Sequence, residues 1–185
     1  ERSKRYTRKG QKVQDRGLSR VARNRAIIML LLDTGVRASE LCGIRMRDLD
    51  KRNQRIKIYG KGAKDRYVSF SVRTAQALWR YLTTRPELEE KDYMFVVDAA
   101  RQFTRDWLLD CLQAIGSRAG VTAVTVHRFR HTFAIQYLRN RGDPYTLQKM
   151  LGHSTLDMVK RYLAIAESDV EAAHRLASPV DNWAL

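Results

Sequence analysis

Three residue types that can do chemistry gather in the last third of the sequence. Histidines stand at His127, His131 and His153, Arg130 lies between the first two, and Tyr162 follows nine residues after the last. An imidazole can transfer a proton near neutral pH, a guanidinium binds anions, and a phenol can act as a nucleophile. In a strongly basic chain, this combination suits the transfer of a phosphoryl group.

The spacing of apolar residues predicts that Arg130 points into the protein. On a helix from about Val126, one apolar stripe contains Val126, Phe129, Phe133 and Tyr137, and Arg130 projects from within it. A guanidinium does not lose its proton, and an unpaired buried charge is costly. We therefore expect either a carboxylate of this chain or a phosphate of a ligand to meet it.

Two other interpretations of the histidines compete with this one. His127 and His131 are four residues apart, as in a zinc-binding pair, but Arg128 stands where the zinc motif has glutamate. The intervening arginines would also repel a dication, so we predict no metal site and no cofactor. Alternatively, the histidines are ordinary structural residues.

The charge balance points to a polyanionic partner. The 185 residues carry 35 Lys plus Arg against 20 Asp plus Glu, a formal net charge of +15. Residues 1–12 hold six of the cations and one anion, so the remainder still carries +10. The basic character therefore belongs to the folded part, which favours nucleic acid as the partner. A hydrophobic content of 44% is enough for a real core.

Other features exclude several classes of protein. Cys42 and Cys111 lack a Cys-x-x-Cys spacing and are expected to be reduced residues of a cytoplasmic protein. The longest apolar run, Ala26–Leu32, is far shorter than the roughly 20 residues of a membrane helix, and no secretory signal precedes it. The basic, glycine-containing start resembles a linker whose N-terminal partner domain has been removed.

The first part of the chain is expected to place a second arginine at a helix entry. A helix is predicted over Ser19–Asp33, with Gly35 as its stop signal and with these residues facing inward: Ile27, Ile28, Leu31 and Leu32. Arg37 then precedes a short helix from Ala38 to about Gly43, whose free N–H groups favour an anion. The alternative is that Arg37 is a surface residue paired with Glu40.

A β-hairpin with a basic tip is predicted next. Arg55–Tyr59 and Arg66–Phe70 alternate polar and apolar residues, and the connection between them is Gly-Lys-Gly-Ala-Lys-Asp. Lys61, flanked by glycines, could swing toward a ligand, although it could also simply keep the turn soluble. Tyr93–Val97 is apolar enough for a third strand.

Later helices are predicted from capping residues, glycines and prolines at their ends. They cover Ser71–Thr84, Thr104–Arg118, Pro144–Gly152, a segment capped by Ser154 with Asp157, and Ser168 to about Leu176. His153 therefore lies on a turn between helices. In the helix after it, we expect Leu156, Val159 and Leu163 to face inward and Tyr162 to fall outside that stripe.

Four segments resemble the catalytic domain of the tyrosine recombinases, the family of phage integrases and Xer-type enzymes. They are TGVRASEL (34–41), GKGAKDRYV (60–68), HRFRHTFA (127–134) and LGHSTLDMVKRY (151–162). Four such segments in the family's order and spacing are highly specific, and they span most of the chain. The resemblance implies an α+β fold, mainly helical, with a small three-stranded antiparallel sheet, known as the DNA breaking-rejoining enzyme fold.

The resemblance also implies a role for each matching residue. Arg37 and Arg130 become the two arginines that clamp the phosphate, Lys61 the hairpin lysine, and Tyr162 the nucleophile. The flanking histidines of the family match His127 and His153, and its acidic residue beside the first arginine matches Glu40. On chemical grounds, Lys61 is the candidate proton donor to the leaving 5′-oxygen.

The implied activity is site-specific recombination or integration of double-stranded DNA through a covalent 3′-phosphotyrosyl intermediate, without metal or ATP. Residues 18–178 would form the catalytic domain, residues 1–17 a basic linker from an absent core-binding domain, and residues 179–185 a C-terminal tail. We expect a monomer in solution, a synaptic tetramer on DNA, no membrane association, and a cytoplasmic, nucleoid-associated protein of prokaryotic or viral origin. Trp183 in the tail would dock on a neighbouring copy or on its own domain.

The sequence leaves two alternative functions open. A type IB topoisomerase would use the same chemistry but relax DNA without exchanging partners. A basic DNA-binding module, such as a regulator, would use the histidines and Tyr162 only as structural residues.

Overall fold

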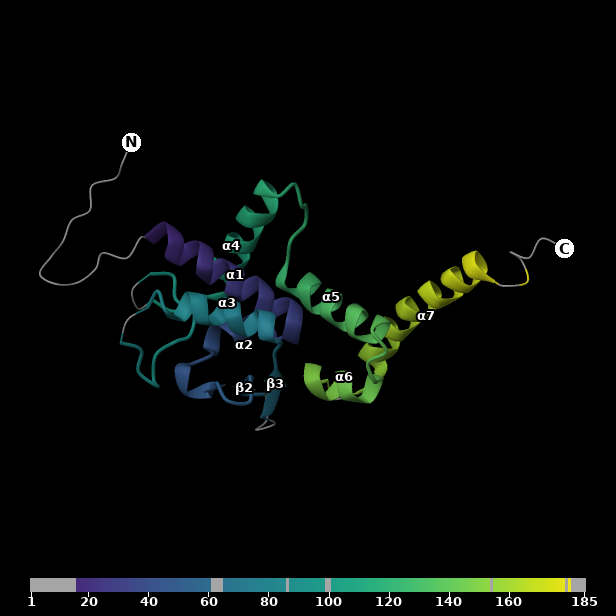
Figure 1. Cartoon of the computed structure of the whole chain (residues 1–185), viewed down its shortest axis with the longest axis horizontal. Coiled ribbons are helices and arrows are strands. Elements are labelled where there is room, and N and C mark those ends of the chain that lie inside the picture. Colours follow the sequence, from purple (N-terminus) through teal and green to yellow (C-terminus); the bar gives the residue numbers. More distant parts are fainter. Residues whose placement is uncertain are drawn as a thin grey trace, which may run out of the picture.

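The computed structural model describes residues 16–60, 65–85, 87–98, 101–153, 155–178 and 180. These residues form seven α-helices, one short 3-10 helix (η1) and three strands (Figure 1). In chain order the elements are α1 (Arg16–Thr34), α2 (Ala38–Gly43), η1 (Met46–Asp48), β1 (Leu49–Asp50), β2 (Arg55–Ile58), β3 (Arg66–Ser69), α3 (Val72–Leu82), α4 (Arg105–Arg118), α5 (Val126–Arg139), α6 (Pro144–Leu151) and α7 (Asp157–Ala177).

The three strands form one antiparallel sheet in the order β1-β2-β3. Ile56 of β2 pairs with Leu49 on one side and with Val68 on the other, and all three side chains are buried. Their alternation with exposed residues is the period-two pattern of a sheet with one covered face. The predicted hairpin and the mainly helical α+β fold are therefore confirmed.

The predicted third strand was wrong. Its place is taken by the two-residue strand β1, while Tyr93–Val97 makes only isolated bridge pairs. Arginine side chains are hydrogen-bonded to the carbonyls of this segment. Arg85 and Arg23 together donate to four of these carbonyls, at distances of 2.6 to 3.0 Å. Carbonyls bound to guanidiniums cannot also form a strand ladder.

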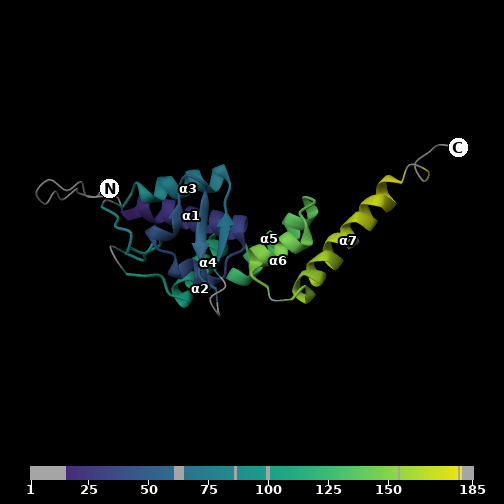
Figure 2. The ribbon, with the colours of Figure 1, turned by 90° about the horizontal axis from the view of Figure 1, so that it is seen from below.

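Two apolar clusters organise the chain. The first lies among α1, α2, α3, α4 and the sheet, and the second joins α5, α6 and the start of α7. Figures 1 and 2 both show α5, α6 and α7 to one side of the other helices. Gly35 lies at the seam between the clusters with a φ of +61°, and a Cβ there would stand 2.5 Å from the ring of Phe133. The close approach of the two halves therefore requires glycine at this position.

Two details of the predicted helices were wrong. Leu32 is exposed, and Leu30 is buried in its place, because the buried face of α1 is turned toward α3 and α5. The predicted helix start at Ser168 does not exist, since α7 runs without a break from Asp157 to Ala177. A Ser-x-x-Glu pattern is compatible with a helix interior when no glycine or proline stops the preceding turn.

Some predicted features lie outside the described residues. These are the hairpin tip with Lys61, the cap residue Ser154, and the tail with Trp183. The described start of α7 has Leu156 at the N-cap and no side-chain cap. Among the described helices, none is both long enough and apolar enough to cross a membrane.

Candidate active site

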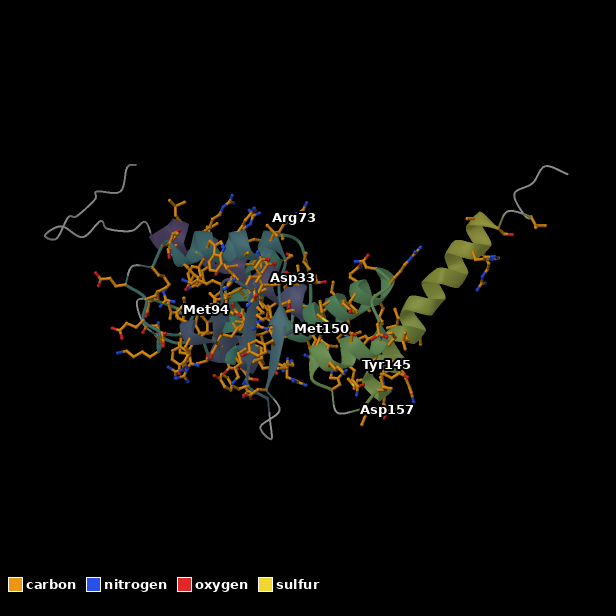
Figure 3. All side chains as sticks on the ribbon, turned by 60° about the horizontal axis from the view of Figure 1, so that its bottom comes forward. Asp33, Arg73, Met94, Tyr145, Met150 and Asp157 are labelled. Atoms are coloured by element: carbon orange, nitrogen blue, oxygen red, sulfur yellow. The ribbon has the colours of Figure 1, made fainter. Side chains whose placement is uncertain are left out.

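Three arginines from distant parts of the chain meet at the C-terminal end of α6. The last carbonyls of a helix lack partners within it and carry its negative partial charge. Here the carbonyls of residues 150–152 accept from Arg66 at 2.8 Å, from Arg130 at 2.7 Å and from Arg37 at 3.2 Å, in that order. Met150, the first of these residues, lies where α6 approaches the sheet (Figure 3). The end of α6 therefore brings together the guanidiniums of Arg37, which precedes α2, Arg66 of β3 and Arg130 of α5.

Arg130 is buried, as its position in the apolar stripe predicted, with 4% of its surface exposed. Its guanidinium donates to the carbonyls of Gly35 and Leu151, both at 2.7 Å, and contacts Nε2 of His153 at 2.7 Å. These partners are all neutral. Among the described residues, no carboxylate is hydrogen-bonded to the Arg130 guanidinium. Burial, followed by the nearby Arg37, lowers the pKa of Arg130 to about 10, which leaves it charged at neutral pH. A buried cation with neutral partners is a site for an anionic ligand.

Glu40 ties the other two arginines together. Its carboxylate accepts two bonds from the guanidinium of Arg66, at 2.8 and 2.9 Å, and two from the guanidinium and backbone N–H of Arg37, also at 2.8 and 2.9 Å. Burial raises the pKa of Glu40, but the hydrogen bonds from Arg66 and Arg37 outweigh it and leave the pKa below its ordinary value. One carboxylate among three guanidiniums leaves two positive charges at the site.

Arg37 keeps a free side despite this pairing. The predicted pair with Glu40 is present, yet 44% of the Arg37 side chain is exposed. The surface and binding interpretations of this residue are therefore compatible, because the pair holds the guanidinium while much of the side chain stays exposed. Its position before α2 adds the free N–H groups of a helix start.

The contact with Arg130 determines the tautomer of His153. A guanidinium can only donate, so Nε2 of the imidazole accepts and Nδ1 carries the proton. Burial, then Arg130 and Arg37, lowers the pKa of His153 to about 4, so the ring is neutral at physiological pH. Nδ1 is buried and has no hydrogen-bond partner among the described residues. The site therefore contains one buried N–H donor without a partner among the described residues.

Tyr162 is buried in the second cluster, with 2% of its surface exposed, so the expectation that it falls outside the inward stripe was wrong. Because α7 packs on α5, its buried face is centred on Val159 and Tyr162, while Leu156 and Leu163 are only partly buried. The phenol hydroxyl has no hydrogen-bond partner among the described residues. Burial raises the pKa of Tyr162, and Arg130 opposes this rise.

A row of aromatic rings leads from the surface to this tyrosine. His127 is exposed and its ring meets His131 edge-on, with centroids 4.4 Å apart, and His131 meets Tyr162 edge-on at 5.3 Å. Burial, then His127 and Arg130, lowers the pKa of His131. In the part of the chain that the structure describes, no group of three or more His, Cys, Asp or Glu side chains could hold a metal ion.

The structure brings together five of the seven residues expected at the site. The ring of His131 separates His127 from Tyr162, and Lys61 lies outside the described residues. It also adds Arg66, which the sequence analysis treated only as the start of a strand. A signal for this residue was present, since in an alternating strand Arg66 shares a face with Val68, which is buried. An inward arginine on a strand is as informative as the inward Arg130 on its helix.

Comparison with known proteins places these residues in a family. The model of the phage integrase family matches residues 13–169. Tyrosine recombinase XerC of Staphylococcus carnosus (strain TM300) is 35% identical over 160 residues, covering 85% of this chain and 54% of the relative. The XerC of Listeria welshimeri is 34% identical over 163 residues, with coverage of 85% and 54%. The chain therefore spans about half the length of the curated relatives it matches.

Solved structures that resemble this chain are also recombinases. The crystal structure of XerA recombinase matches with a TM-score of 0.74 and 32% identity, over 85% of this chain and 59% of that one. The XerH site-specific recombinase bound to its difH substrate, in a pre-cleavage complex, matches with a TM-score of 0.68 and 28% identity, over 78% of this chain and 43% of that one.

Proposed function

Because the chain belongs to the phage integrase family, we propose that residues 18–178 are the catalytic domain of a tyrosine recombinase. This domain cuts and rejoins double-stranded DNA through a covalent 3′-phosphotyrosyl intermediate, without metal or ATP. The observation that carries the proposal is that Arg37 and Arg130 converge on the end of α6 with two uncompensated positive charges, while Arg130 acts electrostatically on Tyr162, whose hydroxyl has no hydrogen-bond partner among the described residues.

The arginines suit the substrate because a DNA phosphodiester is an anion. In-line attack adds negative charge to the oxygens around phosphorus, so guanidiniums held in advance by carbonyls stabilise the transition state more than the ground state. Arg130 is held by two carbonyls, and Arg37 by Glu40 and the carbonyl of Gly152. In this proposal the two arginines supply the positive charge that a metal ion would otherwise bring.

Tyr162 is the proposed nucleophile. Its oxygen forms a bond to phosphorus as the bond from phosphorus to the 5′-oxygen breaks, which leaves the 3′-phosphate joined to the enzyme. A phenolate, with a reference pKa of about 10, leaves more readily than an alkoxide, so the step can run backwards and reseal the strand. Because burial raises the pKa of Tyr162, a base must take its proton, and His127 is proposed to help.

Three further residues complete the proposed site. Lys61 is the proposed acid that protonates the leaving 5′-oxygen. His153 is proposed to donate its unpaired Nδ1–H to a phosphate oxygen, since its other nitrogen is occupied by Arg130. Glu40 supports the site by holding Arg37.

The assembly around this domain is also proposed. We expect residues 1–17 to be a basic linker, residues 179–185 to be a C-terminal tail, and the active species to be a tetramer on synapsed DNA formed from free monomers. Since its substrate is DNA, the proposed place of action is the nucleoid in a prokaryotic cytoplasm. The XerH neighbour, whose structure holds its difH substrate, supports DNA as the partner in this proposal.

The proposal is tested by trapping the covalent intermediate. A suicide DNA substrate, which loses its 5′ fragment on cleavage, is incubated with the protein in EDTA, and the adduct is mapped by mass spectrometry. We expect an adduct at Tyr162, none with Tyr162→Phe at equal DNA binding, and an undiminished adduct with the control Tyr137→Phe, which alters another tyrosine packed in the same cluster. DNA binding without any adduct from the unaltered protein would overturn the proposal in favour of a DNA-binding module.

A further inference from the structure

Arg66, the first residue of β3, connects the two halves of the site. Its two terminal nitrogens donate to the two oxygens of Glu40 at 2.9 and 2.8 Å, and its Nε donates to the carbonyl of Met150 at 2.8 Å. The side chain is 12% exposed, so this guanidinium is mostly enclosed by its partners. One residue therefore holds α2 through Glu40 and the end of α6 through Met150.

Both partners of Arg66 also hold the arginines of the proposed phosphate clamp. Glu40 fixes the guanidinium of Arg37, and the two carbonyls that follow Met150 accept from Arg130 and Arg37. We propose that Arg66 is a positioning residue, which holds Glu40 and the end of α6 in place and thereby directs Arg37 and Arg130 toward the scissile phosphate. This inference rests on the proposed function, because it assigns a role within the same site.

The geometry explains why the residue is arginine. Arg66 makes three bonds in two directions at once, and a planar guanidinium offers five N–H donors in a fixed fork. Lysine would keep the charge but could not span Glu40 and Met150 with one ammonium group. Gly152 completes the arrangement, because a Cβ there would stand 3.2 Å from a terminal nitrogen of Arg66.

Arg66 also joins the hairpin to the site. It begins the strand that follows the tip residues 61–64, and α6 packs against this strand. A displacement of Arg66 would therefore shift the start of β3 as well as the direction in which the Arg37 side chain points. Because small misplacements of a reacting group cost about 100-fold in rate, this link matters for catalysis even though Arg66 has no role in the chemistry itself.

The same sheet offers a matched control. Arg55 of β2 also pairs with a carboxylate, that of Asp50, at 2.8 Å, but its side chain is 41% exposed and stacks on Tyr67. Among the described contacts, no hydrogen bond joins Arg55 to a residue of the site. Arg55→Lys therefore removes an arginine–carboxylate pair from the sheet without touching the proposed clamp.

The test compares Arg66→Lys with Arg55→Lys and the unaltered protein in single-turnover cleavage of the suicide substrate. For Arg66→Lys we expect a rate lower by roughly 10- to 100-fold, with DNA affinity within about threefold, since the defect is in orientation and not in charge. Arg55→Lys should cleave at the original rate. A rate for Arg66→Lys within about twofold of the original would overturn the inference.

A double-variant cycle separates positioning from direct contact. If Arg66 acts through Arg37, then Arg66→Lys should cost much less in a protein that already carries Arg37→Lys, because the clamp it orients is already impaired. Equal costs in the two backgrounds would show that Arg66 acts independently of Arg37 and would overturn the inference.

An NMR measurement tests the positioning role of Arg66 without an activity assay. It therefore distinguishes an error in this role from an error in the proposed function. Rotation about the Cζ–Nε bond of Arg37 should be slow in the original protein and faster in Arg66→Lys, since Glu40 loses an anchor. Should Arg66→Lys melt below the assay temperature, Arg66→Gln, which keeps an N–H donor, replaces it. Unchanged Arg37 rotation would overturn the positioning role, whereas a missing adduct in the original protein would overturn the function.

Discussion

Arginines occupy two contrasting places on this protein. The first set, the site arginines, is held by Glu40 and by carbonyls of Gly35 and α6, and consists of Arg37, Arg66 and Arg130. The second set, the face arginines, lines a shallow cavity of about 370 Å³ between α1 and α3, and consists of Arg25, Arg73 and Arg80. Figure 3 places Arg73 at the outer edge of α3. None of the guanidinium groups of the face arginines has a hydrogen bond or ion pair with another described residue.

The difference shows that charge and preorganisation are separate properties. Both sets carry three guanidiniums, but only the site arginines are fixed before a ligand arrives. Fixed donors need no reorganisation during the reaction, whereas the face arginines are hydrated and their fields fall off within a Debye length of about 8 Å at physiological salt. Lysine keeps the positive charge but lacks the planar set of N–H donors of a guanidinium. Arg-to-Lys changes should therefore lower the cleavage rate at the site arginines and leave it unchanged at the face arginines.

A further group of arginines does structural work. Arg23, Arg45, Arg85 and Arg128 donate to carbonyls in irregular segments of the chain. Each satisfies backbone groups that lack a partner in secondary structure. The net charge of +15 therefore overstates how many of the cations are free to bind an anionic ligand.

The largest effect is expected for Arg130→Lys. A lysine cannot reach the carbonyls of Gly35 and Leu151 together and still face a phosphate, so the cleavage rate should fall by roughly 1,000-fold or more. Arg73→Lys, the matched change on the face, should leave the rate within about twofold. Adduct formation on a suicide substrate measures both, and equal effects of the two changes would remove the contrast between the sets.

A smaller loss is expected for Arg37→Lys. Its side chain is 44% exposed and is held by fewer buried partners than Arg130, so a lysine can partly replace its charge. The cleavage rate should fall by about 100-fold, and the free energy of unfolding should change by less than about 1 kcal/mol, because lysine keeps the charge beside Glu40 and Arg66 still holds that carboxylate. Urea unfolding of Arg37→Lys measures the second quantity, and a loss of several kcal/mol would contradict it.

Glu40→Gln should show a pH-dependent loss of stability. The folded pKa of Glu40 lies below its ordinary value of 4.5, so its ionised form stabilises the fold above that pH, and the contribution is lost as the pH falls through the folded pKa. At pH 7 the variant should be less stable by about 2 to 3 kcal/mol, because two guanidiniums lose their carboxylate. Denaturant unfolding of both proteins from pH 7 to pH 3 should show the gap closing below about pH 4.5. A constant gap would mean that Glu40 is not ionised in the folded protein.

The smallest effect is expected when all three face arginines are changed to glutamine. With no fixed partner and no path to the reacting phosphate, they should alter DNA affinity at physiological salt by less than about threefold and leave the cleavage rate unchanged. A titration of DNA binding against salt provides the decisive measurement. A fall of about three in the slope of log K against log salt would show that these arginines contact phosphates directly.

Local spacing carried much of what could be predicted. Patterns a few residues long predict three elements that the structure confirms. They are the helix from Val126, the short helix Ala38–Gly43 that follows Gly35, and the β-hairpin. The inward direction of Arg130 follows in the same way, because a 3.6-residue period fixes which side chains share a face.

The failures come from partners far away in the chain. Tyr93–Val97 has the composition of a strand, but Arg23, more than 70 residues earlier, binds two of its carbonyls. Tyr162 is buried because α7 lies against α5, which no pattern within α7 records. Such contacts compete with local preference and decide the outcome when they are stronger.

The sequence by itself determined which reactive residues this protein has, their order, and the helix face on which Arg130 lies. Only the tertiary structure decided what those residues touch. The partners of Arg130, Arg37 and Arg66 are Gly35, Gly152 and Met150, which are 95, 115 and 84 residues away. Backbone carbonyls are the same for every residue, so their positions become specific only when the chain folds and the end of α6 reaches the three guanidiniums.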